Sequence, residues 1–339
     1  MNLFAPDYYK DFKCIADKCR HSCCIGWEID IDDEALACYN QMPGKLGIKL
    51  RNNISTDTEP HFILDSDERC PFLTENNLCE IILSSGEDKL CQICSDHPRF
   101  RNFFDSRTET GLGLCCEAAG KLILSQKNKL NIVKLEADNI SEMQNEKVFF
   151  DLRNNIIEML QNRSIPVLDR IKNMLKTYNI TIPYTDWKQT FLNLEHLDNS
   201  WTDKLKELKE NISLFSRSEF EIPFEQLIIY FIYRHLGEAF EDGLIKERIS
   251  FAVLSFYIIS ALCQIHYTNN NSLTLDDLIE ICRLYSSEIE YSQENIDTLL
   301  ELLTQKMQPQ SAAFSHYKIY QIIVIILSTN NALETHITG

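Results

Sequence analysis

The chain has 339 residues, of which 44% are hydrophobic and 24% are charged, and it contains only 10 glycines and 9 prolines. This length can bury a substantial core in one large domain or two, and the scarcity of glycine and proline argues against a turn-rich all-β fold and against disordered linkers. The net charge is −17, and Lys and Arg form no cluster, so neither nucleic acid nor an anionic membrane surface is expected as a partner.

The N-terminus predicts no export signal, because it lacks a basic start followed by an apolar core. The longest apolar run covers residues 251–263 and is too short to cross a bilayer. We therefore expect a cytoplasmic protein whose thiols stay reduced.

Cysteines are concentrated near the N-terminus, where eleven of the thirteen lie between residues 14 and 117. A dense set in a reducing compartment favours metal or iron–sulfur binding over a disulfide framework. Thiolates suit zinc, copper(I) and iron–sulfur clusters, and a site normally takes four. Nine cysteines are candidate ligands, enough for nearly two sites: Cys14, Cys19, Cys23, Cys24, Cys70, Cys79, Cys91, Cys94 and Cys115. The pattern is compatible with two metal sites or with one site and additional structural thiols.

An iron–sulfur cluster is the favoured occupant, because Cys91-x2-Cys94 has ligand spacing and Cys-Pro pairs such as Cys70-Pro71 occur in ferredoxin-like runs. A structural zinc site is the main alternative, and disulfides or free thiols are the third. The C-x3-C-x2-C fingerprint of radical enzymes is absent, since Gly26 stands where it requires a cysteine. Three further thiols are expected to pack in the interior, namely Cys38, Cys263 and Cys282.

Local patterns in the first part of the chain predict little regular structure. Residues 27–31 alternate apolar and acidic, which predicts a short strand, and Asp32 or Asp33 is expected to cap a helix that runs through Tyr39. Residues 70–81 predict a hairpin around Asn76-Asn77. A helix is expected to start at residues 115–119 and to continue through Leu124.

Residues 126–146 are polar and mark the expected domain boundary, after which apolar residues recur every three or four positions. Pro166 should break the first helical stretch, and Thr274 with Asp277 predicts a capping box. The segment 224–240 is apolar on nearly all sides and should be central. The remaining helices are predicted at 187–197, 202–215, 246–265, 274–287, 293–306 and 314–328.

The expected fold is therefore mainly α. Residues 1–125 should form an irregular, cysteine-rich metal or iron–sulfur module with a minor β hairpin, and residues 126–339 an α-helical domain.

The cysteine pattern resembles the flagellin lysine-N-methylase family and, in the first half, the broader superfamily of zinc- or iron-chelating cysteine domains. The similarity rests mainly on four segments, which are Cys14-x4-Cys19-x3-Cys23-Cys24, Cys70-Pro71-Phe72-Leu73 with Leu78-Cys79, Leu90-Cys91-x2-Cys94 with Pro98-Arg99, and Cys115-x-Glu117-Ala118-Ala119. Residues 194–201 and 230–235 agree as well. The chain departs from the family pattern at Cys116, where a proline is usual, and at His97, where an aromatic residue is common.

The resemblance implies methyl transfer from S-adenosyl-L-methionine to lysine side chains of flagellin, the protein of the bacterial flagellum, with a 4Fe–4S cluster on the shared cysteines. Such chemistry needs a neutral amine, so Glu117, Glu28 and Asp30 are candidate catalytic carboxylates. Arg99 is a candidate for gripping the cofactor carboxylate, whereas His235 is expected to be a core histidine. The alternative function is a non-enzymatic metal-binding, iron–sulfur carrier or redox protein, which needs no pocket for a methyl donor beside its cysteines.

Overall fold

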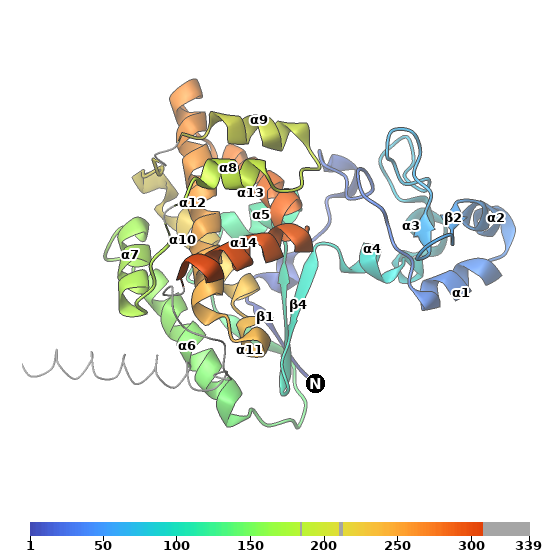
Figure 1. Ribbon diagram of the computed structural model, residues 1–339. Helices are drawn as coiled ribbons and strands as arrows, with labels where there is room; N and C mark the ends of the chain where they lie inside the picture. Colours follow the sequence, from blue (N-terminus) through green and yellow to red (C-terminus); the bar gives the residue numbers. More distant parts are fainter. Residues whose placement is uncertain (184, 210–212, 308–339) are drawn as a thin grey trace, which may run out of the picture. The chain divides into compact units, whose positions relative to one another are not determined.

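The computed structural model describes residues 1–183, 185–209 and 213–307. The protein is mainly helical, with one small sheet, and it divides into two compact units (Figure 1). The helical unit comprises residues 1–11, 101–115 and the chain from residue 120 onward. The cysteine unit comprises residues 12–100 and 116–119. Sequence analysis predicted one boundary, after residue 125. Each unit is instead assembled from separate segments that alternate along the sequence.

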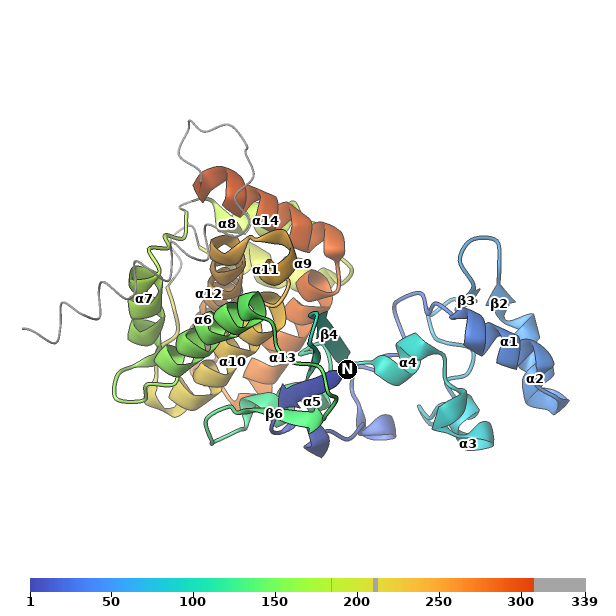
Figure 2. The same ribbon diagram turned by 90° about the horizontal axis from the view of Figure 1, so that it is seen from below.

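The helical unit contains a four-stranded sheet in the order β4-β5-β1-β6. The first strand runs parallel to β5, with Asn2 opposite Arg107, and antiparallel to β6, with Pro6 opposite Ile132 (Figure 2). The strands are β1 (Asn2–Pro6), β4 (Arg99–Phe103), β5 (Arg107–Leu112) and β6 (Ile132–Glu136). Sequence analysis predicted none of these strands. All four are short, and β1 pairs with β5 and β6, which lie more than 100 residues further along the chain, whereas β4 and β5 are neighbours in sequence.

Helices form the bulk of this unit. They are α5 (Glu117–Leu124), α6 (Gln144–Leu160), α7 (Val167–Thr177), α8 (Trp187–Leu192), α9 (Asn199–Glu207), α10 (Glu221–His235), α11 (Ala239–Asp242), α12 (Ile245–Asn270), α13 (Leu275–Tyr285) and α14 (Gln293–Met307). A five-residue π-helix, Ser286–Glu290, extends α13. Short 3₁₀ turns occur at Tyr9–Asp11 and Ser218–Phe220.

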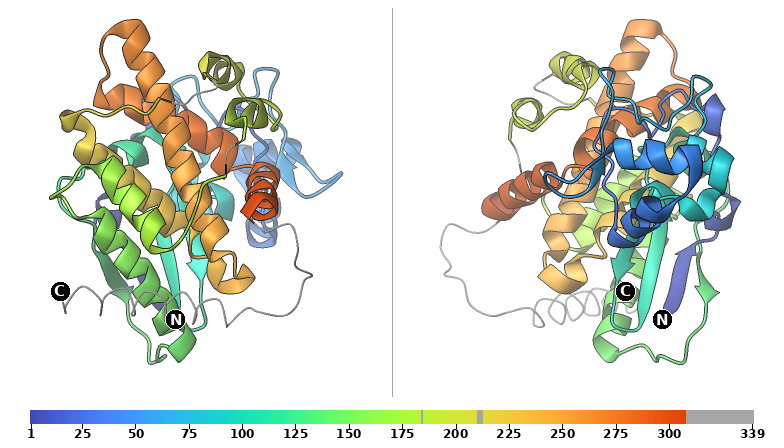
Figure 3. Two further views of the ribbon diagram at one scale, coloured as in Figure 1. Left: turned by 60° about the vertical axis from the view of Figure 1, so that its left-hand side comes forward. Right: turned by 90° about the vertical axis from the view of Figure 1, so that its right-hand side faces the viewer.

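The core of the helical unit is built on α10 and α12, which pack side by side (Figure 3). Every residue of α10 from Phe224 to His235 is buried, as the apolar sequence predicted. The ring of Phe224 lies 5.3 Å from that of Phe256 on α12, an edge-to-face contact. These two helices therefore position the polar side chains that α10 carries into the interior.

Most helix predictions are confirmed, with shifted ends. Pro166 separates α6 from α7, and Thr274 and Asp277 form the predicted capping box of α13. Two helices are shorter than predicted, since α8 ends at Leu192 and α9 at Glu207. The predicted helix at 314–328 lies outside the described residues.

The longest helix, α12, has 26 residues and is long and apolar enough to cross a membrane by length and composition. Within the protein, 78% of its most apolar stretch is buried, as in the core helix of a globular domain. The helix is longer than the 251–263 run that the sequence suggested, because the polar residues at both of its ends continue the same helix.

The cysteine unit contains short elements joined by long loops. They are α1 (Asp33–Gln41), α2 (Gly44–Asn52), β2 (Ile54–Ser55), β3 (His61–Phe62), α3 (Glu80–Ser85) and α4 (Gln92–Asp96), with 3₁₀ turns at Ala16–Lys18 and Glu87–Lys89. The two strands pair as an antiparallel ribbon, and α1 and α2 contact each other (Figure 2).

Two local predictions in this unit hold and two need correction. Asp32 caps α1 by accepting a hydrogen bond from the Ala35 amide, 2.9 Å away, and Asn77 takes the predicted positive φ in its turn. The predicted strand at 27–31 is reduced to one β-bridge, Asp30 to His61, because only two residues pair in β3. The predicted hairpin at 70–81 keeps one bridge, Leu73 to Cys79, since α3 begins at Glu80.

Candidate functional site

None of the thirteen cysteines, all of which lie in the described residues, is joined in a disulfide bond. Eight of the nine predicted ligands belong to the cysteine unit, and Cys115 belongs to the helical unit. The cysteines therefore do not form a disulfide framework, and the candidate site has to be sought among thiols that the fold brings together.

One group of thiols, the core cysteine set, comprises Cys24, Cys70, Cys79, Cys91 and Cys94. All five pack in one hydrophobic core together with the buried side chains of Ile29, Tyr39, Phe62 and Phe72. Residues 46 positions apart are joined here, because the Cys70 amide donates a 2.8 Å hydrogen bond to the Cys24 carbonyl. The turn at 74–78 brings Cys79 back toward Cys70.

The remaining two members of the core cysteine set come from α4. Cys91 is the N-cap residue of this helix, and Cys94 lies one turn further on. A hydrogen bond of 3.1 Å from the Ser95 amide to the Cys91 carbonyl closes that turn. The Cys-x2-Cys spacing therefore does place two thiols on one helical turn, as the sequence predicted.

Hydrogen bonding between thiols changes their ionisation. The contact with Cys23 lowers the pKa of Cys24 to about 7, against the effect of burial, with Ser22 and Arg69 acting in the same direction. A hydrogen bond with Cys94 likewise lowers the pKa of Cys91. Burial raises the pKa of Cys70 to about 12. The pKa of Cys79 and Cys94 is raised as well, so Cys24 is the member of the set whose pKa lies near neutral pH. The thiolate is the form that binds metal.

The donor chemistry of the core cysteine set suits a soft metal or an iron–sulfur cluster, since it gathers five sulfur atoms in one core. The side chains do not form a closed coordination shell. Within residues 1–183, 185–209 and 213–307, no group of three or more Cys, His, Asp or Glu side chains could hold a metal ion as placed. Side-chain rotation would be needed to close a site around a bound group.

A second group of thiols comprises Cys14, Cys19, Cys23 and Cys116, which lie close enough to influence one another electrostatically. The loop that carries Cys19 is linked to the start of α5, because the Arg20 amide and guanidinium both contact the Glu117 carboxylate, at 3.3 and 3.4 Å. Cys116, which replaces the family proline, therefore joins this group rather than the core set.

The candidate carboxylates occupy two places in the cysteine unit. Glu117 pairs with Arg20. Glu28 lies 3.5 Å from the His61 ring, with its side chain 61% exposed, and the backbone of Asp30 forms a β-bridge with the same histidine. Arg99 lies over the ring of Phe12, 5.5 Å from the centroid, and donates to the Ser95 carbonyl at 3.1 Å.

A depression of about 470 Å³ lies beside the core cysteine set. Gln92, Ile93 and Asp96 of α4 form one wall, and these residues flank Cys94. Three more carboxylates line it, those of Asp30, Asp32 and Glu59. We call it the acidic pocket. Sequence analysis named Asp30 but had no means of bringing it to α4.

The helical unit holds a buried polar network that sequence analysis missed. Glu290, at the end of the π-helix, accepts hydrogen bonds from Tyr230 at 2.9 Å and pairs with Arg234 at 3.2 Å and His235 at 2.6 Å. Tyr230 also accepts from the Leu114 amide at 3.2 Å, next to Cys115. His235 is thus a satisfied core histidine, as expected, and π-helical turns often occur at functional sites.

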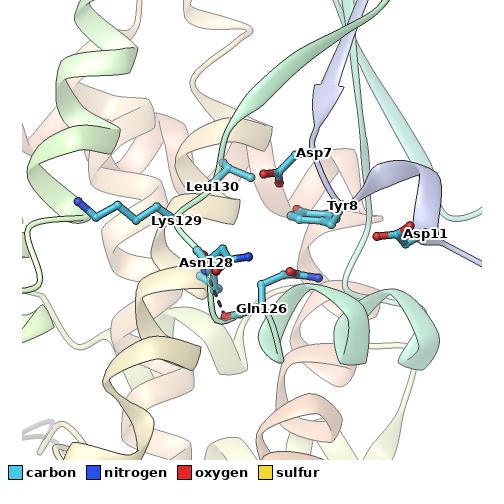
Figure 4. Close-up of a pocket in the computed structure, with 8 residues that line it drawn as sticks. Asp7, Tyr8, Asp11, Gln126, Asn128, Lys129 and Leu130 are labelled. Atoms are coloured by element: carbon cyan, nitrogen blue, oxygen red, sulfur yellow. Dashed lines mark hydrogen bonds between the residues drawn. The ribbon is translucent and has the colours of Figure 1, made fainter.

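The helical unit also contains a pocket of about 200 Å³, the Tyr8 pocket, shown in Figure 4. It is lined by Asp7, Tyr8, Asp11, Gln126, Asn128, Lys129, Leu130 and Gln226. Tyr8 and Asp11 come from the turn that follows β1, and the 126–130 segment precedes β6.

These features define a mainly helical protein that carries a separate thiol-rich unit with an acidic pocket. Residues 110–314 match the model of the FliB lysine N-methylase C-terminal domain, and the chain belongs to this family. The match covers most of the helical unit and its buried network, so the resemblance that the cysteines suggested is confirmed mainly through a different part of the chain.

Curated relatives agree over a limited region. A lysine-N-methylase of Salmonella typhimurium is 26% identical over 139 residues, which are 37% of this chain and 33% of the relative. The flagellar biosynthetic protein FliU of Salmonella muenchen is 25% identical over 133 residues, covering 37% of this chain and 78% of FliU. The matched region spans about a third of the length of the lysine-N-methylase. No solved structure matches.

Proposed function

We propose that this protein is an S-adenosyl-L-methionine-dependent methyltransferase that modifies lysine side chains of a flagellar protein, with flagellin as the expected substrate. The family and the relatives named lysine-N-methylase and FliU support the reaction and the flagellar context. A cytoplasmic location belongs to the same proposal, because a thiol-rich unit needs reducing conditions.

The observation that carries the proposal is the acidic pocket beside the core cysteine set. Its volume of about 470 Å³ suits a small organic cofactor. S-adenosyl-L-methionine carries a sulfonium and an ammonium group, and four carboxylates, those of Asp30, Asp32, Glu59 and Asp96, surround the pocket. A carrier or redox protein needs an accessible cluster but no such pocket.

Methyl transfer requires the lysine amine in its neutral form. Asp30 lines the acidic pocket and is therefore the best placed of the three candidate carboxylates to accept a proton, directly or through water. Glu28 and Glu117 do not line it. Arg99 does not line it either, and its assignment to the cofactor carboxylate stays a prediction.

An iron–sulfur cluster is proposed at the core cysteine set, with four of Cys24, Cys70, Cys79, Cys91 and Cys94 as its ligands. When bound, such a cluster would supply electron-transfer capacity next to the acidic pocket. The chain's own part would be to hold the group in an apolar core and to bind the methyl donor at α4. Zinc at the same thiols is the alternative metal.

Labelled methyl transfer tests the activity. Purified protein incubated with flagellin and methyl-labelled S-adenosyl-L-methionine should label lysine residues. The Asp30→Asn/Glu59→Gln variant should bind the cofactor about tenfold more weakly in calorimetry, because two carboxylates that face the cation are neutralised. Asp33→Asn/Asp67→Asn removes the same charge from exposed positions outside the pocket and should bind normally. Equal binding by both double variants would refute the assignment of the pocket.

Metal analysis tests the cluster separately from the activity. Protein purified without oxygen should contain iron and acid-labile sulfide, and Cys91→Ser/Cys94→Ser should lose both. Cys38→Ser is the matched control, since Cys38 is a half-buried thiol of the same unit outside the core set. Zinc without iron in the wild-type protein would replace the cluster by a structural zinc site. Iron without any methyl transfer would favour the carrier or redox function.

A further inference from the structure

The Tyr8 pocket in the helical unit has a lining that neither the cysteine chemistry nor the acidic pocket explains. Its walls are held by hydrogen bonds before any ligand arrives. Asp7 is fixed to the segment before β6, because its amide donates to the Asn131 carbonyl at 2.8 Å and its carboxylate accepts from the Asn131 side chain at 3.2 Å. The opposite wall is fixed by Gln226 of α10, which donates to the Asn128 carbonyl at 2.8 Å.

Tyr8 lies in this pocket between Asp7 and Gln126, with its hydroxyl turned toward the 126–130 segment (Figure 4). The residue is only 7% exposed. Within the described part of the chain, its hydroxyl makes no hydrogen bond, although buried hydroxyl groups are normally paired. A hydroxyl that lines a pocket and lacks a protein partner indicates that a ligand or water supplies the missing partner.

The charges at the Tyr8 pocket favour a cation. The carboxylates of Asp7 and Asp11 lie at its edge, and both side chains are exposed. Lys129 is the one basic residue in the lining, and Figure 4 shows its side chain extended away from the other lining residues. The open space is therefore faced by two acids and by the electron-rich ring of Tyr8, which attracts cations.

A primary alkylammonium group fits this lining better than other cations. It has N–H donors for the Tyr8 hydroxyl and the neighbouring Asp7 carboxylate, and an apolar stem that can lie against Leu130 and the Tyr8 ring. Asp11, beyond the other end of the ring in Figure 4, adds negative charge to the lining. A bare metal ion fits poorly, because no three acidic, histidine or cysteine side chains in the described residues are arranged to hold one. The volume of about 200 Å³ suits a single side chain.

We propose that the Tyr8 pocket binds the protonated side chain of a lysine of the protein substrate. The choice of a substrate lysine rests on the proposed function, whereas the preference for a primary alkylammonium rests on the pocket alone. Each methyl group added to the nitrogen removes one N–H donor, so the pocket distinguishes an unmodified lysine from a trimethylated one.

Binding of small probes to the full-length protein tests this inference. Nα-acetyl-lysine methylamide should bind in calorimetry or in ligand-observed NMR. The norleucine analogue, which replaces the ammonium by a methyl group, should bind about tenfold or more weakly, because it lacks charge-assisted hydrogen bonds. The Nε-trimethylated analogue should bind between the two. Equal affinity of the lysine and norleucine probes would overturn the proposal.

Variants of the lining residues test whether the probe binds in the Tyr8 pocket. Asp7→Asn/Asp11→Asn should weaken binding of the lysine probe about tenfold, and Tyr8→Phe, which removes one hydrogen bond, about threefold. Asp151→Asn is the control for the loss of an exposed negative charge, because Asp151 is an exposed residue of α6 outside the pocket, and it should leave binding unchanged. Both pocket variants alter exposed carboxylates or a single oxygen, so normal melting temperatures should accompany the loss. Unchanged binding in the pocket variants would refute the assignment.

The proposed function and the ammonium site can be refuted independently of each other. If the wild-type protein binds the lysine probe in the Tyr8 pocket but transfers no methyl group, the proposed function is wrong and the ammonium site stands. If it methylates flagellin while Asp7→Asn/Asp11→Asn binds the lysine probe and the substrate normally, the ammonium site is wrong and the proposed function stands.

Discussion

The carboxylate of Glu290 and the imidazole of His235 lie 2.6 Å apart in the interior of the helical unit, Oε1 to Nε2. Arg234, the residue before His235, donates to the Glu290 carbonyl at 3.2 Å and contacts its carboxylate. The short π-helix and the end of α10 are thereby joined through the buried Glu290 carboxylate, which also accepts a hydrogen bond from Tyr230 and so has three partners on α10.

Glu290→Gln should destabilise the helical unit by about 3–5 kcal/mol, because it leaves the buried Arg234 without a counter-charge. Urea unfolding monitored by circular dichroism measures the loss. Glu238→Gln is the control, since Glu238 also pairs with an arginine, Arg248 at 2.7 Å, but is 53% exposed. Exposed pairs contribute at most about 1 kcal/mol, so Glu238→Gln should lose little stability. If Glu290→Gln lost equally little, the buried network would not be stabilising.

Acid should destabilise the folded state, starting below neutral pH. Burial lowers the pKa of His235 despite its hydrogen bond to Glu290, so the unfolded state binds the proton first as the pH falls below about 6.5. Arg234 and then His235 lower the pKa of Glu290 to about 2, against burial. Its contribution is complete above about pH 4.3 and is lost as the pH falls toward 2.

The variant His235→Gln isolates the first part of this dependence. Its free energy of unfolding should vary less between pH 7 and 5 than that of the wild-type protein, as measured by urea titration at each pH. His97 in the cysteine unit, whose pKa burial and then Arg99 lower to about 4, contributes with the same sign in both proteins. Parallel pH profiles for wild type and variant would contradict the role assigned to His235.

Gly237→Ala should cost about 1–3 kcal/mol by overpacking. A Cβ at this position would lie 2.5 Å from the Asn102 Nδ2 atom, and that amide donates to the carbonyls of Tyr233 and Arg234, at 3.3 Å each. Chemical denaturation of the Asn102→Ala/Gly237→Ala double variant provides the check. Because Asn102→Ala removes the two nearest of the clashing atoms and leaves only the Cβ, at 3.1 Å, the added methyl should cost less there, and simple additivity would exclude this contact as the cause.

Asp32→Ala should destabilise the cysteine unit by about 1–3 kcal/mol, because one carboxylate serves two helices. It accepts from the Ala35 amide of α1 at 2.9 Å and from the Gln92 amide of α4 at 2.7 Å. Amide hydrogen exchange should accelerate at both positions. Asp33→Ala, one residue further on, removes an exposed acid and should cost under about 1 kcal/mol. Acceleration at Ala35 alone would mean that α4 does not depend on Asp32.

Only the residue types of the candidate site could be predicted from the sequence. Sulfur ligands are identified by residue type, so Cys91 and Cys94 on one helical turn could be named in advance. The grouping of the thiols, in which Cys23 contacts Cys24 and Cys115 lies in a different unit from Cys116, could not be predicted, because it depends on how distant segments of the chain pack. Glu290 gave no local signal, since its partners are more than 50 residues away.

The sequence by itself determined most of the helices of the helical unit and several of their boundaries. The caps at Asp32 and Thr274, the break at Pro166 and the turn at Asn77 depend on atoms within about four residues, so local chemistry decides them. The tertiary structure decided the sheet, where Asn2 pairs with Arg107, the acidic pocket that joins Asp30 to α4, and the buried Glu290–His235 pair. These depend on contacts between distant segments, whose free energy appears only when the whole chain packs.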